Sequence, residues 1–477
     1  TLYIIHCTLP FSTFQLFNSS TVVVVHCTLP FSAVQLQKAP CIFAGSFFIC
    51  IFFKFIYNII SMVKVLLFFY NFLMLILLVP ILLGIFFSGK KNRQEFLYKI
   101  SERLSCWNAP ELDKNKKTVW IHCASLGEAR AVEPMIPHLR EYNIVVSVIT
   151  KSAREYISKI KGVSYYALMP VDIYPFIAKQ LKKINPDILI LIETEFWPGM
   201  ITCASRLGTK IITVNGRISK NAFPYYKITK FFWKPFLNLL SFISVRNEQD
   251  YERFYAITDN KNKLEITGNI KYDRDWTHER MERSDLFVSP TDLIFTAGST
   301  RDGEEKIIMN VYKKLKEKHK NLKLIIAPRH ISRVKEVVKL AEKNNLKFAL
   351  FSRLTESEKD VIIVDVFGKL QAVYSVSDVV FVGGSIVNKG GQNPIEAAAY
   401  AKPVIFGKYM FNFESEVKAL INNGCFEVGN ETEFTAVVDK LLSDEKLREK
   451  SGGEAVKTVD NQKGAVARNI KIISNII

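Results

Sequence analysis

Asp378–Phe413 reads DVVFVGGSIVNKGGQNPIEAAAYAKPVIFGKYMFNF, and this stretch decides the fold class. Its first residues, DVVFV, are β-branched and aromatic, which is typical of a buried parallel strand. Gly383 and Gly384 follow where such a strand ends, and NPIEAAA from Asn393 has the capping, proline and glutamate residues that begin a helix. A glycine turn beside a helix N-terminus predicts an anion site. The alternative is that these glycines only make tight connections between strand and helix.

The same order of apolar strand, turn and helix recurs along the chain in two series joined by Tyr272–Pro290. The expected strands are 118–123, 143–150, 187–193 and 210–215 in the first series, and 291–300, 321–330, 347–351, 360–366, 378–382 and 402–407 in the second. Alternation of strands with helices predicts parallel sheets. We therefore expect an α/β protein with two Rossmann-like domains that face a cleft, at 108–280 and 281–477.

Composition narrows the range of partners. The chain has 477 residues, is 48% hydrophobic and carries a net charge of +18, so it can build more than one core and favours an anionic partner. Its lysines are spread along helical segments, and no nucleic-acid-binding motif is found, so we expect no nucleic-acid partner. The eight cysteines show neither a CxxC pair nor a metal-ligand spacing, which predicts reduced thiols and no metal site.

Residues 1–61 differ from the rest because HCTLPFSTFQL, at His6–Leu16, recurs as HCTLPFSAVQL at His26–Leu36. Two copies are too few to bury a stacked solenoid core. We interpret this segment as an atypical extension that is not part of the native protein, which would then start at Met62. The alternative is a native segment with a membrane-associated stretch over Ile42–Ile60.

Residues 62–92 predict a membrane anchor, because Val65–Phe87, VLLFFYNFLMLILLVPILLGIFF, is apolar almost throughout. No signal-peptidase site follows it, so the anchor is expected to stay on the protein. Basic residues directly after it predict a single-pass protein of the inner membrane with both domains on the cytoplasmic face. The alternative is a buried core helix.

Polar side chains gather where the expected strands end, which is where open α/β sheets bind ligands. Glu128 follows the strand at 118–123 and begins a helix, so it can act as a general base or merely complement the helix dipole. Glu193 and Glu195 end the strand at 187–193, where they can orient an acceptor or pair with Arg217.

Arg329 and His330 end the strand at 321–330. A fixed guanidinium at that place can hold a phosphate through two hydrogen bonds, or it can form a structural ion pair. Ser299, in the segment AGST, places a hydroxyl at the end of the preceding strand.

With these residues assembled, the sequence from Met62 onward resembles the Kdo transferases, which move 3-deoxy-D-manno-oct-2-ulosonic acid (Kdo) from CMP-Kdo to the lipid A precursor. The resemblance rests on ordered motifs: WIHCASLGEARA, ETEFWP, NGRIS, GNIKYD, AGSTRDGEE, APRH and the opening stretch. It implies a GT-B fold and an inverting transfer that needs neither a metal nor another cofactor. It also implies CMP-Kdo and the lipid A precursor as partners.

The resemblance assigns roles to particular positions. Glu128 matches the family's proposed catalytic base. The residues expected on the donor side are Ser299, Arg329, His330, Gly384, Ser385, Asn393 and Glu396. Of these, Glu396 is suited to accept hydrogen bonds from ribose hydroxyls. Glu193, Glu195 and Arg217 are expected on the acceptor side.

Two alternatives remain open. Other GT-B sugar-nucleotide transferases and epimerases share this architecture, because a fold does not fix a function. The positive charge also suits a non-catalytic, membrane-tethered protein that binds anionic lipid or nucleic acid, which would not need Glu128.

Overall fold

The computed structural model describes residues 2–7, 14–18, 21–27, 62–78, 97–357 and 359–477, with isolated positions between 80 and 94. The chain forms two compact units, residues 1–62 and 63–477. In the first unit, β1 (Leu2–Cys7), β3 (Thr21–Cys27) and β2 (Phe14–Asn18) form a sheet in that order. Parallel pairing of β1 with β3 sets Cys7 opposite Cys27, so the register follows the internal repeat. The stretch Ile42–Ile60 lies outside the described residues.

A seven-stranded parallel sheet, in the order β10-β9-β8-β7-β4-β5-β6, forms the centre of the first domain. Its strands are β4 (Thr118–His122), β5 (Asn143–Val148), β6 (Tyr165–Leu168), β7 (Ile188–Ile192), β8 (Lys210–Gly216), β9 (Phe242–Val245) and β10 (Leu264–Ile266). The helices of this domain are α3 (Ile100–Arg103), α4 (Leu126–Val132), α5 (Lys151–Ile157), α6 (Tyr174–Ile184), α7 (Pro198–Arg206), α8 (Phe223–Ile228), α9 (Lys230–Leu237) and α10 (Glu248–Thr258).

A second seven-stranded parallel sheet has the order β13-β14-β12-β11-β15-β16-β17. Its strands are β11 (Leu293–Thr300), β12 (Leu322–Pro328), β13 (Phe348–Leu350), β14 (Val361–Ile363), β15 (Val379–Val382), β16 (Val404–Gly407) and β17 (Cys425–Val428). The helices that follow are α11 (Glu304–Lys318), α12 (Val334–Lys343), α13 (Leu370–Val376), α14 (Ile395–Ala398), α15 (Glu414–Leu420), α16 (Glu431–Ser443), α17 (Glu445–Asn461) and α18 (Ala465–Ile476).

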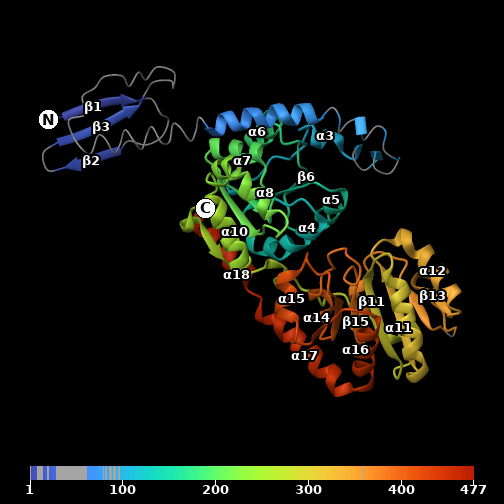
Figure 1. Ribbon diagram of the computed structural model, residues 1–477. Helices are drawn as coiled ribbons and strands as arrows, with labels where there is room; N and C mark the ends of the chain where they lie inside the picture. Colours follow the sequence, from blue (N-terminus) through green and yellow to red (C-terminus); the bar gives the residue numbers. More distant parts are fainter. Residues whose placement is uncertain are drawn as a thin grey trace. The chain divides into compact units, whose positions relative to one another are not determined.

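The α/β architecture with two Rossmann-like domains is therefore confirmed (Figure 1). The central strands β4 and β7 are buried along their whole length, which explains why they read as continuous apolar runs. The sequence did not predict β6, β9, β10 and β17. All four strands include partly or fully exposed residues, so their apolar signal is weaker.

The last helix, α18, returns to the first domain, although it follows the second sheet in the chain (Figure 1). Ala465, Val466 and Ile473 of α18 join the apolar core beneath the first sheet. The Asp273 carboxylate accepts hydrogen bonds from the backbone N–H groups of Gly464 and Val466, which holds the start of this helix. The chain thus crosses between the two domains twice.

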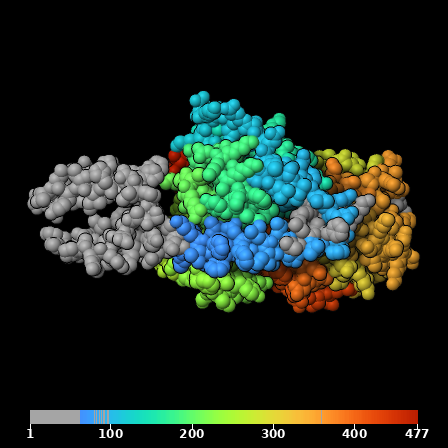
Figure 2. Space-filling model, turned by 90° about the horizontal axis from the view of Figure 1, so that it is seen from above, coloured from blue at the N-terminus to red at the C-terminus, as the bar shows by residue number. Residues whose placement is uncertain are grey.

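The predicted membrane anchor is wrong. Within the residues that the structure describes, no helix combines the length and the apolar character needed to cross a bilayer. Residues 62–78 are helical and lie along the surface of the first domain (Figure 2). The Tyr70 hydroxyl donates to Asp172 at 3.0 Å, and the backbone N–H of Tyr174 donates to the Asn71 side chain at 2.8 Å. The inner-membrane location drawn from the anchor is overturned with it.

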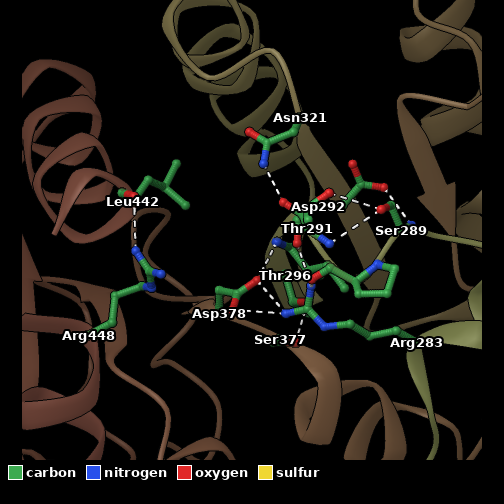
Figure 3. Close-up of polar contacts among 12 residues, drawn as sticks. Arg283, Ser289, Thr291, Asp292, Thr296, Asn321, Ser377, Asp378, Leu442 and Arg448 are labelled. Carbon is green, nitrogen blue, oxygen red and sulfur yellow. Dashed lines mark hydrogen bonds and ion pairs between the residues drawn. The ribbon is translucent and has the colours of Figure 1, made fainter. Parts of the chain in front are cut away.

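A polar clamp attaches the interdomain segment to the second sheet (Figure 3). Arg283 donates from Nη2 to both Asp378 oxygens, at 3.0 and 2.9 Å. Asp378 in turn accepts from the backbone N–H of Ile294 at 2.7 Å, at the start of β11. One carboxylate therefore holds β11, β15 and the linker together.

Replacing Asp378 with alanine should destabilise the protein by about 2 kcal/mol, because Arg283 and the Ile294 N–H both lose a charged partner. The measurement is the urea midpoint of unfolding. Asp460→Ala, which removes an exposed pair with Lys463, is the matched control and should change stability by less than about 1 kcal/mol. An equal loss of stability in the two variants would show that the clamp stabilises the protein no more than an exposed ion pair does.

Candidate functional site

Glu128 lies at the carboxyl end of β4, in the first turn of α4. Ser125 caps this helix, with its hydroxyl accepting from the Glu128 N–H at 3.4 Å. The Glu128 carboxylate folds back over the same turn. It accepts from the Ala124 N–H at 2.7 Å and from the Ser125 hydroxyl at 2.9 Å. Glu128 therefore lies in the first turn, where it can complement the helix dipole as the alternative from the sequence states, and its carboxylate is held in one orientation.

The electrostatic surroundings of Glu128 suit proton transfer. Burial, reinforced by the nearby charges of Glu193 and Glu195, raises the pKa of Glu128 to about 7, although the bonds from Ala124 and Ser125 act to lower it. A carboxyl group with a pKa near neutrality is ionised in part at pH 7 and is a much stronger base than an ordinary glutamate. The same pKa makes this group a candidate general base.

The two neighbouring carboxylates are held by different partners. Glu193 forms an ion pair with Lys271 at 2.6 Å. Burial acts to raise the pKa of Glu193, but Lys271 together with the charges of Arg246 and Arg217 outweighs burial, so the pKa is lowered. Glu195 accepts from the Trp197 indole at 2.8 Å and lies 3.5 Å from the buried His122 imidazole. Arg217, the partner considered from the sequence, forms no ion pair with either carboxylate among the described residues, but its charge helps to lower the pKa of Glu193.

Backbone strain marks this edge of the sheet. Glu193 and Asn215, at the ends of β7 and β8, have φ values of 57° and 61°, in the left-handed region that favours glycine. Ser299, at the end of β11 in the second domain, has a φ of 56° and falls where the register of the strand shifts. Irregular strand ends of this kind re-aim side chains and often occur beside active sites.

In the second domain, the glycine turn after β15 already binds an anion of the protein itself. The fully buried carboxylate of Glu304, at the start of α11, accepts from the backbone N–H groups of Gly384 at 2.6 Å and Ser385 at 2.9 Å. It also accepts from Ile386 at 3.0 Å and from Arg301 at 2.8 Å. The N–H groups expected to face a ligand are thus directed at Glu304.

The glycines and Ser385 serve close packing in this turn. A Cβ atom on Gly383 would lie 2.7 Å from the Ser299 carbonyl oxygen, so only glycine fits beside the end of β11. The Ser385 hydroxyl donates to the Val382 carbonyl at 2.6 Å and accepts from the Gly407 N–H at 2.8 Å. The structure thus supports the alternative that the turn makes a tight connection. A role of Gly384 and Ser385 in donor binding stays a prediction.

The helix expected from Asn393 is shorter than predicted. It spans Ile395–Ala398, with Pro394 as its cap, while Asn393 accepts from the Ile395 N–H at 3.1 Å. Ala401 has a φ of 56°, which ends any helix before Pro403. One turn gives little dipole, so this helix end is a weak anion site.

The charge of Arg329 acts on the pKa of the Glu396 carboxyl group. Burial raises the pKa of Glu396, whereas the charges of Arg130, Arg274 and Arg329 and a hydrogen bond with Asn393 act against burial. Arg130 belongs to α4 of the first domain, which shows that the two strand-end edges approach each other here. The Arg329 backbone N–H donates to Thr300, while its side chain is exposed.

His330 and Ser299 complete the expected donor side. His330 is exposed, and its Nε2 lies 2.7 Å from Nη1 of Arg301. Ser299 is almost buried. The structure therefore brings Arg329, Asn393 and Glu396 together, and it leaves His330 beside Arg301.

Sequence reasoning missed several residues of this site. Three residues were not among the expected site residues, because each contacts a partner far away in the chain: Lys271, His122 and Glu304. A usable signal existed for Glu304: an acidic residue at a helix start next to a strand end can bind a neighbouring glycine turn. Arg130 was read as part of a motif and Arg274 as part of a linker.

Comparison with known proteins agrees with this geometry. Residues 98–274 match the family model described as 3-Deoxy-D-manno-octulosonic-acid transferase (kdotransferase), and residues 301–458 match Glycosyl transferases group 1. A 3-deoxy-D-manno-octulosonic acid transferase from Aquifex aeolicus is 34% identical over 70% of this chain and 90% of its own length. The chain belongs to the 3-deoxy-D-manno-octulosonic acid transferase family. It is a glycosyltransferase.

Two further similarities are to a longer relative and to a solved structure. The transferase is 34% identical to a bifunctional glycosyltransferase/methyltransferase from Fusobacterium nucleatum, of which the alignment spans 58%. A glycosyltransferase structure from Rickettsia africae has a TM-score of 0.54 and 16% identity, covering 76% of this chain and 99% of that one. The latter similarity supports the GT-B fold alone.

Replacing Glu304 with alanine should destabilise the transferase by about 3 kcal/mol or more, because four backbone N–H groups would lose their acceptor inside the protein. The thermal midpoint of unfolding measures this effect. Asp302→Ala is the matched control, since Asp302 is 89% exposed and pairs only at the surface with Arg333. A Glu304→Ala protein as stable as the control would mean that a ligand or solvent, rather than Glu304, organises the turn.

Proposed function

We propose that the transferase moves Kdo from CMP-Kdo to a hydroxyl group of the lipid A precursor, with inversion at the anomeric carbon and with Glu128 as general base. Family membership supports the class of reaction. The observation that carries the catalytic assignment is the oriented, partly buried carboxylate of Glu128 with a pKa of about 7.

In the proposed step, the acceptor oxygen attacks the anomeric carbon while the bond from that carbon to the phosphate of CMP breaks. Glu128 takes the proton of the attacking hydroxyl, so no free alkoxide forms. The leaving phosphate gains negative charge, and Arg329 is the exposed cation at the end of β12 that can stabilise it. A single displacement inverts the configuration.

The partners of the neighbouring carboxylates are consistent with Glu128 as the base. Lys271 neutralises Glu193, whereas Glu128 has no cationic partner within its own hydrogen-bond set. Glu128 therefore remains the carboxylate with a raised pKa. Glu193, Glu195 and Arg217 are proposed to contact the acceptor, and Glu396 the ribose of the donor, on the basis of the family resemblance.

The decisive assay combines purified protein, CMP-Kdo and lipid A precursor, with mass spectrometry of the lipid product. Glu128→Gln should lower kcat by about 10²- to 10⁴-fold while CMP still binds, because the variant keeps the shape of the side chain and loses the base. Wild-type kcat should rise with pH up to about 7 and then level off, as Glu128 ionises.

Glu155→Gln is the control, since Glu155 is an exposed residue of the first domain that pairs with Lys151. Near-normal turnover of Glu128→Gln would reject the base assignment. Epimerisation of a sugar nucleotide, or lipid binding without release of CMP, would reject the proposed reaction in favour of the alternatives.

A further inference from the structure

Arg274 is a buried cation whose hydrogen-bonding capacity is largely unused. It follows η3 (Ile270–Asp273), is 6% exposed, and its guanidinium stacks over the Trp276 ring at 4.6 Å. Its Nε lies 3.9 Å from Glu133, too far for a hydrogen bond. Nε and Nη1 are buried and have no hydrogen-bond partner.

Arg130 repeats this situation from the neighbouring helix. Its guanidinium lies over the Tyr156 ring at 5.6 Å, and its buried Nε has no partner. The Tyr156 hydroxyl donates to Glu133, so the nearby carboxylate is engaged by an uncharged group. Two guanidinium groups thus accompany one carboxylate.

Arg274 lies beside the second domain, because the Trp276 ring on which it stacks belongs to an apolar core with Tyr374 and Val380 of that domain. The positive charges of Arg130 and Arg274, together with that of Arg329, act to lower the pKa of Glu396, which lies beyond the end of β15. Glu396 does not satisfy them, since the nitrogens named above remain without a partner. Arg130 also lies two residues after Glu128 in α4. Arg130 is thus close in the chain to the proposed base, and the charges of both arginines reach Glu396 on the proposed donor side.

A buried guanidinium N–H that has lost water and gained no acceptor is unfavourable, and proteins rarely keep such groups without a function. Arginine binds carboxylates and phosphates through paired, charge-assisted hydrogen bonds. Stacking on Trp276 and Tyr156 fixes the planes of the two groups. An oxyanion that entered this space would supply the missing acceptors.

We propose that Arg130 and Arg274 form an oxyanion subsite between the two domains that binds an acidic group of the nucleotide-sugar donor. That group is either the nucleotide phosphate or the carboxylate of the sugar. The identity of the donor rests on the proposed function, whereas the subsite itself rests on the two arginines.

Two measurements distinguish a bound phosphate from a bound sugar carboxylate. The first is calorimetric titration with CMP and with cytidine, and the second is the KM for CMP-Kdo. Arg130→Gln and Arg274→Gln should each weaken binding by about tenfold or more. If the phosphate is bound, CMP affinity falls while cytidine affinity is unchanged. If the sugar carboxylate is bound, CMP affinity is unchanged and the KM for CMP-Kdo rises by a similar factor. Arg274→Lys, which keeps the charge without the paired donors, should restore part of the loss.

Lys314→Gln is the matched control, because it removes one positive charge from an exposed pair with Glu431 in the second domain. CMP affinity and KM within twofold of wild type in both arginine variants would overturn the subsite. If Arg274 variants unfold, the less buried Arg130→Gln decides alone. If the wild type binds CMP but transfers no sugar, the proposed function fails, and titration of the variants with CMP and with CMP-Kdo tests the subsite separately, because affinities for both ligands within twofold of wild type would overturn it.

Discussion

Burial of the Glu128 carboxylate beside two other carboxylates is the constraint on which the first half of the site depends. Like charges held close together in a partly buried place cannot all ionise freely, so one of them keeps a raised pKa. Lys271 compensates Glu193, and the indole of Trp197 binds Glu195. Glu128 is bound only by the Ala124 N–H and the Ser125 hydroxyl. The arrangement thus gives Glu128 a raised pKa and Glu193 a lowered one.

The second half of the site rests on another internal anion. Glu304 gathers four backbone N–H groups from the turn after β15 and the start of α11, so the turn is ordered without a ligand. Electrostatic preorganisation of this kind means that donor binding need not reorganise the loop. We propose that recognition of the donor then falls to side chains around the turn, among them Arg329, Asn393 and Glu396. The anion site inferred from the glycines exists, but the protein fills it.

The sequence was sufficient for the central strands of the two sheets, because buried parallel strands appear as apolar runs, and it placed Glu128 at a strand end, where its role as base stays a prediction. It could not show that Glu304 bonds to Gly384, which is far away in the chain, or that Lys271 pairs with Glu193. Asn71 illustrates a wrong prediction rather than a missed contact. It looked like a small interruption in a membrane span, yet its side chain binds the backbone of the first domain at Tyr174. Tertiary partners decide such cases, and no local pattern reveals them.

The most direct test of the central claim is titration of Glu128 by NMR of protein labelled with ¹³C at the glutamate carboxyl groups, with Glu128→Gln to assign the signal. The account predicts an apparent pKa near 7. It also predicts that this pKa falls when Glu193 and Glu195 are replaced by glutamine, because their charges help to raise it. A Glu128 signal that titrates near the ordinary value of about 4.3, and is unmoved by those replacements, would contradict the account.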